Sequence, residues 1–372
     1  MQYTQFGNTG VKVSRLGFGC MRLPTKEKGK NVPDVEVSVA LLRKAVERGV
    51  NYFDTAVFYN ERLSEQTLGQ AMRGLRDKIY LSTKCPGWES QKPGDYRRTL
   101  EAQLKRLETS YIDFYHFHGI SYDNFFETDQ RTGWIDDARK AKEEGLIKHI
   151  SFSYHGKSGD IQKLVDLGLF ETMLCQYNVL DRSNEEGMKY AKSKGLGVAV
   201  MGPLGGGRIS GLPKKTAEKL GIKAVASAEL GLRFVASNPN VDVLLSGMSS
   251  ETQLEENVEY VSRLASLSAS ELDAIDTMMK ENKRLAELYC TGCKYCVPCP
   301  HGVEIPHIFK MVNYHRIYGI KEYAKKWYDG IGTGDLKGKK ADACTECGEC
   351  EEKCPQKIEI RKQLKEAVEL FK

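Results

Sequence analysis

The chain has 372 residues, of which 41% are hydrophobic, and its 55 basic and 50 acidic residues give a net charge of +5. This length and hydrophobic content suit one large α/β domain with a small appendage. Interspersed charges predict no nucleic-acid or membrane partner, and an N-terminus without a basic start and a long apolar run predicts a cytoplasmic location.

The first two thirds of the chain show a repeating pattern of strands and helices. Residues 2–17 alternate polar and apolar side chains around an Asn-Thr-Gly turn, which predicts a β-hairpin that caps one end of the fold. Short apolar runs then alternate with amphipathic stretches such as residues 96–107 and 183–194. The expected strands are residues 16–20, 51–55, 79–84, 112–118, 149–153, 173–178, 197–203 and 241–247. Eight strands, each followed by a helix, favour an α/β fold of the closed (β/α)8 TIM barrel type, with further helices at residues 251–263 and 268–288.

The last part of the chain is rich in cysteine, with eight of the eleven cysteines in two runs. The runs are Cys290, Cys293, Cys296 and Cys299, then Cys344, Cys347, Cys350 and Cys354. The second run is followed by Pro355 and has the C-x2-C-x2-C-x3-C-P spacing of bacterial two-cluster ferredoxins, whereas the first run is one residue shorter in its last gap. Zinc sites usually separate two C-x2-C pairs by a long loop, and a cytosolic location disfavours disulfides. The runs therefore predict two 4Fe-4S clusters in a small C-terminal helical ferredoxin-like domain.

The ferredoxin precedent implies that the fourth cysteine of each run serves the other cluster. One cluster is then held by Cys290, Cys293, Cys296 and Cys354, and the other by Cys344, Cys347, Cys350 and Cys299. The expected domains are a barrel of residues 1–265, a connecting helix of residues 266–289 and a cluster domain of residues 290–372. The Gly- and Lys-rich stretch 330–340 is expected to be an exposed loop, and the single cysteines Cys20, Cys85 and Cys175 are expected to pack in the core.

Polar residues stand at the ends of three expected strands, where a barrel of this type builds its active site. Asp54, Lys84 and His118 end the second, third and fourth strands, and Tyr59 follows the second. Such a set can protonate a carbonyl oxygen while hydride arrives at its carbon. A neighbouring ammonium lowers the pKa of a phenol, so we expect Tyr59 as proton donor, Asp54 as the partner of Lys84, and His118 as the residue that orients the substrate or relays the proton. We expect His116, His149 and His155 to be structural.

These motifs resemble the aldo-keto reductase superfamily over nearly all of residues 1–262. GVNYFDTAVFYN, LSTKC and YIDFYHFHG carry the family's catalytic residues, so the resemblance implies that Asp54, Tyr59, Lys84 and His118 take those roles. It also implies an NAD(P)H site, because MGPLGGGRISG is similar to the family's cofactor loop and SGMSSETQLEENVEY to the segment that grips the adenosine half. The cofactor-binding residues that it implies are Met21, Ser153, Gln176, Gly202, Pro203, Leu204, Gly206, Gly247, Met248, Gln253, Glu256 and Asn257. The cysteine tail places the chain in a subgroup fused to a ferredoxin-like domain.

The chain departs from the family pattern around the nicotinamide nucleotide. Tyr154 follows Ser153 where the family commonly has Asn, and Leu174 stands where a Gln is frequent. Gly247 and Gln253 replace the Lys and Arg that many members use for the 2′-phosphate. Without that fixed cation, the choice between NADP and NAD stays open.

The leading hypothesis is an oxidoreductase that reduces a small-molecule carbonyl, or oxidises an alcohol, with NAD(P)(H). Its clusters would exchange electrons with a ferredoxin or flavoprotein partner. One alternative is a cluster-fed reductase, with or without a flavin, for which no motif is present, and another is a non-enzymatic redox sensor. The substrate is expected to depend on the rim loop after the fourth strand, whose aromatics would line an apolar pocket or pack against the tail; they are Tyr122, Phe125, Phe126 and Trp134.

Overall fold

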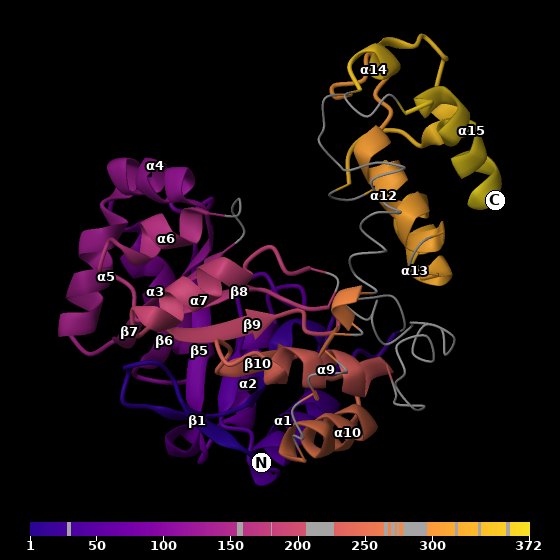
Figure 1. Ribbon diagram of the computed structural model, residues 1–372. Helices are drawn as coiled ribbons and strands as arrows, with labels where there is room; N and C mark the ends of the chain where they lie inside the picture. The colour runs from indigo at the N-terminus through magenta and orange to yellow at the C-terminus, as the bar shows by residue number, and fades with distance from the viewer. Residues whose placement is uncertain are drawn as a thin grey trace. The chain divides into compact units, whose positions relative to one another are not determined.

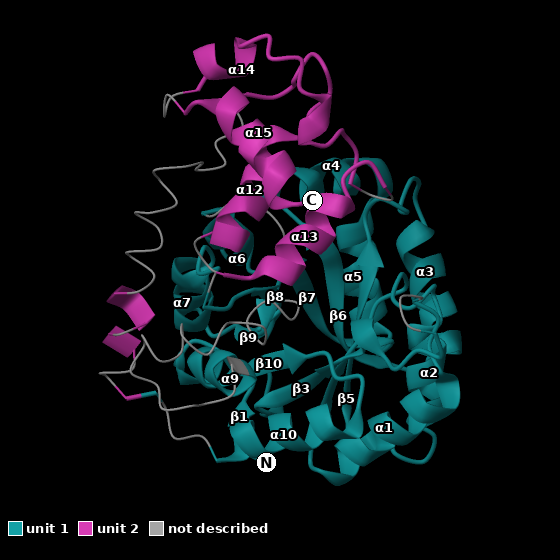
Figure 2. Cartoon of the chain, turned by 90° about the vertical axis from the view of Figure 1, so that its right-hand side faces the viewer, with its two compact units in different colours: residues 1–206, 228–267 teal, residues 207–227, 268–372 magenta. Residues whose placement is uncertain are grey.

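The computed structural model describes residues 1–27, 31–154, 159–179, 181–205, 227–263, 267–268, 272–273, 275–277, 296–316, 319–333, 336–354 and 358–372. The chain forms two compact units, residues 1–206 with 228–267 and residues 207–227 with 268–372 (Figure 2). The first unit holds the barrel, and the second holds the described cysteines of the tail.

Eight parallel strands close into a barrel in the order β10-β3-β4-β5-β6-β7-β8-β9. They are β3 (Leu16–Gly19), β4 (Tyr52–Asp54), β5 (Tyr80–Pro86), β6 (Ile112–Ile120), β7 (Ile147–Tyr154), β8 (Thr172–Gln176), β9 (Gly197–Met201) and β10 (Val243–Ser246). Each strand begins and ends within about two residues of its expected place, which is the usual precision of such boundaries. The (β/α)8 prediction is therefore confirmed.

Helices surround the barrel, as Figures 1 and 2 show. They are α1 (Val35–Glu47), α2 (Ser64–Ala71), α3 (Asp95–Arg106), α4 (Tyr122–Thr132), α5 (Trp134–Glu143), α6 (Asp160–Val165), α7 (Glu185–Ser193), α9 (Ser227–Ser237) and α10 (Glu251–Ser262). Three of these correspond to the helices expected at residues 96–107, 183–194 and 251–263. The helix expected at residues 268–288 lies largely outside the described residues.

The segment after β6 differs from the sequence prediction, because it is the helix α4 and not a rim loop. Ser121 begins the helix with a capping box, in which its side chain and that of Asn124 bond each other's backbone N–H groups. Phe125 and Trp134 are buried, and both rings contact Phe117, at centroid distances of 5.1 and 4.5 Å. These two aromatics therefore pack between the helices and the barrel and do not form a pocket wall.

A hairpin closes the end of the barrel at which the strands begin. β1 (Tyr3–Gln5) pairs antiparallel with β2 (Lys12–Ser14), as expected. The Phe6 ring beyond β1 lies 5.5 Å from that of Tyr52 and 4.9 Å from that of Phe114, near the starts of β4 and β6. This apolar plug leaves the carboxyl ends of the strands as the end available for chemistry.

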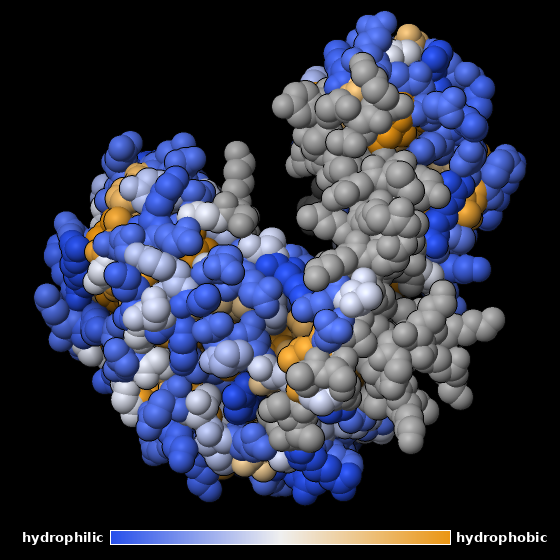
Figure 3. Space-filling model, viewed as in Figure 1, coloured by the Kyte–Doolittle hydropathy of each residue, from blue (hydrophilic) through white to orange (hydrophobic). Residues whose placement is uncertain are grey.

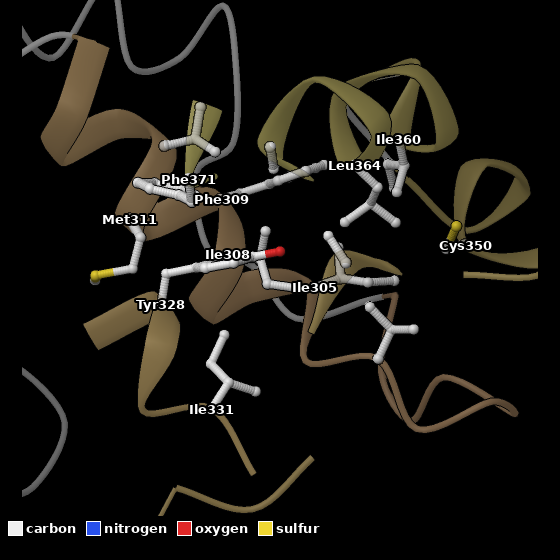
Figure 4. Close-up of a cluster of buried hydrophobic side chains, with 14 of the residues drawn as sticks. Ile305, Ile308, Phe309, Met311, Tyr328, Ile331, Cys350, Ile360, Leu364 and Phe371 are labelled. Carbon is white, nitrogen blue, oxygen red and sulfur yellow. The ribbon is translucent and has the colours of Figure 1, made fainter. Parts of the chain in front are cut away.

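The second unit has its own apolar core, built by α12 (Ile305–Arg316), α13 (Lys321–Asp329), α14 (Glu349–Glu352) and α15 (Ile360–Leu370). Figure 4 shows side chains from these helices pointing toward one another, among them Ile308, Phe309, Tyr328 and Leu364. The stretch expected as an exposed loop at residues 330–340 is mostly exposed or partly exposed where described, but Ile331 is buried in this core.

The surface shows no membrane-spanning feature in the part of the chain that the structure describes. No helix there is long and apolar enough to cross a bilayer. The face of the barrel unit seen in Figure 3 carries mainly hydrophilic side chains, with apolar ones in small scattered groups.

Candidate active site and cluster site

A buried ion pair lies at the carboxyl end of the barrel. Asp54 is the last residue of β4, and Lys84 lies on the neighbouring strand β5. The Lys84 ammonium is 2.7 and 2.9 Å from the two carboxylate oxygens of Asp54 and 2.7 Å from the carbonyl oxygen of Thr55. The two paired side chains are only 1% and 4% exposed. Lys84 thus donates to three oxygen atoms of the protein, which fix its ammonium group in place.

Tyr59 faces this ion pair from the turn after β4. The Lys84 Nζ atom lies 5.0 Å from the centroid of the Tyr59 ring. Burial raises the pKa of the Tyr59 phenol and outweighs the Lys84 charge, which lowers it, so the expected fall in this pKa is wrong. Burial also lowers the pKa of Lys84, but Asp54 and then Tyr59 raise it by more, so the net shift is upward. At neutral pH the site therefore holds a neutral phenol beside a charged ammonium.

Three residues after Tyr59 have left-handed backbones. The φ angles of Asn60, Glu61 and Arg62 are 51°, 53° and 67°, and none of them is glycine. Each such residue costs about 1–2 kcal/mol relative to right-handed backbone. The turn that carries Tyr59 is therefore strained, as is common where a structure fixes a functional side chain.

His118 reaches the same rim from β6, next to β5, where its Cα partner is Pro86. Its ring lies 4.9 Å from the ring of Trp88, which is 54% exposed and stacks on Phe58 at 5.5 Å. The exposed Trp88 makes this a candidate aromatic wall for a substrate. Sequence reasoning missed Trp88 and Phe58, although Trp88 stands only four residues after Lys84 in the loop that follows β5.

The loop that carries Trp88 is fixed from two sides. The Arg131 guanidinium on α4 donates to the carbonyl oxygens of Gly87 at 3.4 Å and Ser90 at 2.9 Å. Arg62 pairs with Glu89 at 2.5 Å, and its guanidinium lies 4.5 Å from the Phe58 ring centroid. The wall is thus held by charged groups outside it.

Below the ion pair, hydrogen bonds continue into the barrel. Ser82 Oγ donates to Asp54 Oδ2 at 2.9 Å, and His116 Nε2 lies 2.9 Å from Ser82 Oγ. Both Ser82 and His116 are fully buried. Sequence reasoning did not find Ser82 and assigned His116 a structural role.

The carboxyl ends of β3 and β10 bring two glycines together. A Cβ atom built on Gly19 would meet no atom closer than 3.6 Å, and one built on Gly247 would meet none closer than 3.4 Å, to Cβ of Arg22. A Cβ atom would thus make ordinary van der Waals contacts at both positions, and Gly247 is exposed, so a ligand can reach its backbone.

The first turns of α10 lie beyond β10 and carry three of the expected cofactor residues. The Gln253 amide oxygen accepts from the Ser249 N–H at 2.8 Å, and the buried Asn257 donates to Ser246 Oγ at 3.0 Å. Glu256 is exposed. Two of the three side chains therefore organise the junction of β10 and α10.

The other expected cofactor residues lie at several strand ends. Ser153 is buried, and its hydroxyl accepts the Gly119 N–H at 2.7 Å. Gln176 covers Gly202, whose φ is 64° and where a Cβ atom would lie 2.5 Å from the amide nitrogen of Gln176. Met248 is fully buried and Met21 is 55% exposed, while Pro203 and Leu204 follow β9 and Gly206 lies outside the described residues. The structure thus places the described members of the set near the carboxyl ends of the barrel strands.

In the second unit, one pocket is surrounded by cysteines. The cysteines that line it are Cys296, Cys299, Cys344, Cys347 and Cys350. Cys354 is buried in the neighbouring core, and Cys290 and Cys293 lie outside the described residues. Among the described residues, no three metal-binding side chains converge on a single ion, so the cysteines encircle a space and do not meet at a point.

Comparisons with known proteins agree with the division into a barrel unit and a cysteine-rich unit. Residues 15–280 match the aldo/keto reductase family, and residues 289–359 match the 4Fe-4S dicluster domain. An L-galactose dehydrogenase of Arabidopsis thaliana is 30% identical over 308 residues, which cover 75% of this chain and 94% of that protein. A probable voltage-gated potassium channel subunit beta of Oryza sativa subsp. japonica is 27% identical over 334 residues, covering 78% of this chain and 100% of that protein.

Solved structures of aldo-keto reductases also align with most of the chain. An aldo-keto reductase of Bacillus halodurans in its holo form aligns with a TM-score of 0.64 and 28% identity, covering 74% of this chain and 96% of that one. An aldo/keto reductase of Klebsiella pneumoniae, solved with NADP and acetate, aligns with a TM-score of 0.63 and 25% identity, covering 75% and 96%. The chain therefore belongs to the aldo-keto reductase family of oxidoreductases and carries a 4Fe-4S dicluster domain after its barrel.

Proposed function

We propose that this oxidoreductase reduces the carbonyl group of a small molecule, or oxidises the corresponding alcohol, with NAD(P)(H). The observation that carries the proposal is the buried Lys84 ammonium, which Asp54 holds at 2.7 Å and which faces the Tyr59 ring at 5.0 Å. A neutral phenol beside a fixed positive charge can give up its proton to an oxygen atom and be stabilised as phenolate.

The rim fits a dinucleotide. The backbone of the exposed Gly247 is accessible after β10, and the N-terminus of α10 beyond it favours an anionic group such as a pyrophosphate. Gln176 and Ser153 would lie against the nicotinamide, with Gln253, Glu256 and Asn257 on the adenosine side. When bound, a reduced nicotinamide supplies a hydride to the carbonyl carbon.

The protein's own residues would complete the reaction. Tyr59 gives its hydroxyl proton to the carbonyl oxygen, and Lys84 stabilises the phenolate that remains. Asp54 keeps Lys84 charged and in place. His118 and Trp88, at the same rim, would orient the substrate oxygen and cover its apolar part.

For the second unit, we propose two 4Fe-4S clusters that exchange electrons with a ferredoxin or flavoprotein partner. The pocket lined by Cys299, Cys344, Cys347 and Cys350 supports the second ligand set expected from the ferredoxin precedent. Cys354 does not line that pocket, which agrees with its assignment to the other cluster. Cys296, which the precedent assigns to the first cluster, lines the pocket as well, so the pocket alone does not separate the two ligand sets.

The experiment that tests the carbonyl proposal compares wild-type protein with Tyr59→Phe. Both are purified anaerobically, titrated with NADH and NADPH, and assayed against a panel of aldehydes and ketones. We expect Tyr59→Phe to lose at least about 100-fold in kcat while its affinity for the nicotinamide nucleotide is unchanged. Tyr190→Phe, on the exposed side of α7, is the matched control and should keep full activity.

Two outcomes would contradict the proposal. One is that neither NADH nor NADPH binds the wild-type protein, and the other is that Tyr59→Phe turns over as fast as wild type. If wild type binds the nucleotide but turns over no carbonyl compound, the non-enzymatic redox sensor becomes the better account.

A cluster-fed reductase is the second candidate, and one observation favours it. The Ser153 hydroxyl is already engaged by Gly119, and the neighbouring Tyr154 is fully buried, so this chain offers few polar side chains to a nicotinamide amide. In such an enzyme, electrons from reduced clusters would support carbonyl reduction without NADH or NADPH.

A further inference from the structure

His116 lies directly beneath the candidate catalytic residues and cannot touch a substrate. It is on β6, where its Cα partners are Lys84 on β5 and Ser151 on β7, and its side chain is fully buried. Its Nε2 atom is 2.9 Å from Ser82 Oγ. The contact with Ser82 links the His116 side chain to the candidate catalytic residues.

The direction of each hydrogen bond follows from counting protons. Asp54 is a carboxylate that Lys84 holds through both oxygens, so it can only accept. Ser82 has one hydroxyl proton and donates it to Asp54 Oδ2 at 2.9 Å. With that proton used, the contact between Ser82 and His116 is a hydrogen bond only if His116 Nε2 carries the proton and donates.

We propose that His116 and Ser82 are positioning residues for carbonyl reduction, acting through Asp54 on Lys84. The Nε2–H of His116 fixes the Ser82 hydroxyl, and that hydroxyl fixes the plane of the Asp54 carboxylate. Asp54 and the Thr55 carbonyl oxygen then hold the Lys84 ammonium, which lies 5.0 Å from the centroid of the Tyr59 ring. This inference rests on the proposed carbonyl reduction and adds two residues that position the Lys84 ammonium.

The environment of His116 keeps its ring neutral. Burial and, after it, the nearby Lys84 charge lower the pKa of His116 to about 3. The imidazole is therefore neutral at neutral pH and carries a single N–H. A neutral buried ring with a fixed tautomer is suited to holding another group rather than to moving protons.

The tautomer can be read directly by NMR on the holoprotein labelled with ¹⁵N-histidine. The chain has only 7 histidines, and His116→Gln identifies the resonances that belong to this one. We expect a protonated Nε2 and an unprotonated Nδ1 from about pH 6 to about pH 9, with a shift of the Nε2–H signal in Ser82→Ala. An Nδ1–H tautomer or a charged ring would overturn the inference.

Kinetics provide the functional readout. His116→Leu removes the donor, and we expect kcat for carbonyl reduction to fall about tenfold with KM changed less than about twofold. His116→Gln, whose side-chain amide can place an N–H near the Nε2 position, should recover most of that loss. His149→Leu is the matched control, because it removes another barrel histidine that bonds Glu171 away from the site.

If His116→Leu does not fold, Ser82→Ala carries the same test by removing only the hydroxyl. Unchanged kcat in either variant, or His116→Gln as slow as His116→Leu, would overturn the inference. If the wild-type protein reduces no carbonyl compound, the proposed function fails on its own, and the tautomer measurement still decides whether the hydrogen-bonded chain exists.

Discussion

Burial and charge act in opposite directions on the phenol of Tyr59. Burial raises its pKa above the ordinary 10.0 and outweighs the Lys84 ammonium. A proton donor with a raised pKa stays protonated at neutral pH. We therefore expect kcat/KM for carbonyl reduction to be flat from about pH 6 to about pH 9 and to fall above about pH 10, which a pH–rate profile measures.

A fall in this profile with an apparent pKa below about 9 would speak against the raised pKa of Tyr59. The variant His118→Gln is the control, because His118 also lies at this rim. A fall that persists in His118→Gln belongs to Tyr59, and one that disappears belongs to the histidine.

Glu171 makes a pH-dependent contribution to stability just before β8. Burial raises the pKa of its carboxyl, but hydrogen bonds from His149 at 2.8 Å and Lys142 at 2.6 Å lower it by more, from 4.5 to about 2. A depressed pKa adds stability that is fully present above pH 4.5 and is lost as the pH falls toward 2. We expect Glu171→Gln to lower the free energy of unfolding at pH 7, with the difference from wild type shrinking below pH 4.5 in urea denaturation.

If the free energies of unfolding of wild type and Glu171→Gln differ by the same amount at pH 7 and at pH 3, Glu171 acts by packing and not by charge. Glu186→Gln, at an exposed position of α7, controls for the loss of one negative charge and should change the free energy of unfolding by less than about 0.5 kcal/mol.

At the level of single residues, the sequence predicted part of the candidate active site and missed the rest for a physical reason. Asp54, Tyr59, Lys84 and His118 could be named because as a set they gather at or just after the ends of neighbouring strands and match the motifs of a known family. Ser82 and His116 could not, because alternate residues of a barrel strand face its interior and a buried Ser or His there is ordinary. Only the positions of their side chains in the folded barrel, with His116 Nε2 2.9 Å from Ser82 Oγ, show that they bond each other.

Among the elements, the turn between β4 and α2 holds three of the five left-handed non-glycine residues in the described part of the chain. Asn60, Glu61 and Arg62 are left-handed, and the side chain of Glu61 is exposed. Because glycine adopts this conformation without steric cost, we expect Glu61→Gly to raise the free energy of unfolding by up to about 1 kcal/mol. Glu101→Gly, in the interior of α3, should instead lower it by about 1 kcal/mol.

Chemical denaturation of the two glycine variants measures whether each one raises or lowers the free energy of unfolding. If Glu61→Gly destabilises the protein as much as Glu101→Gly does, the left-handed turn is not strained in solution. An assay of Glu61→Gly also reports whether the turn fixes Tyr59, since a looser turn would lower kcat despite the higher stability.

The elements themselves were largely predictable, with one instructive exception. Strands buried on both faces leave short apolar runs that stand out between amphipathic helices, so all eight were found. The helix α4 was taken for a loop because its Phe125 and Phe126 were interpreted as rim aromatics. The capping box of Ser121 and Asn124 and the left-handed Gly133 at its end are the local signals that mark it as a helix.

For the whole molecule, the cluster domain makes a countable prediction. With two 4Fe-4S clusters, anaerobically purified protein should contain about eight iron and eight sulfide ions per chain. Cys347 is exposed and lines the pocket of one proposed cluster, so Cys347→Ser should lose about four iron ions. Cys85→Ser, at a buried position in the barrel, should lose none.

Iron analysis together with the visible absorption spectrum measures this prediction. An unchanged iron content in Cys347→Ser would remove Cys347 from the ligand set. A loss of iron in Cys85→Ser would show that the barrel affects cluster retention, which the proposal does not expect.

The central claim is that hydrogen passes directly from a nicotinamide to the carbonyl carbon at the Tyr59 site, and not as electrons through the clusters. Isotope transfer tests it most directly: the wild-type protein is given an aldehyde substrate with NADH or NADPH deuterated at C4, and the alcohol is analysed by mass spectrometry and NMR. The account predicts deuterium at the carbinol carbon from one face of the nicotinamide, with the hydroxyl hydrogen coming from solvent. Alcohol formed with only solvent hydrogen at that carbon, using either face of either nucleotide, would contradict it.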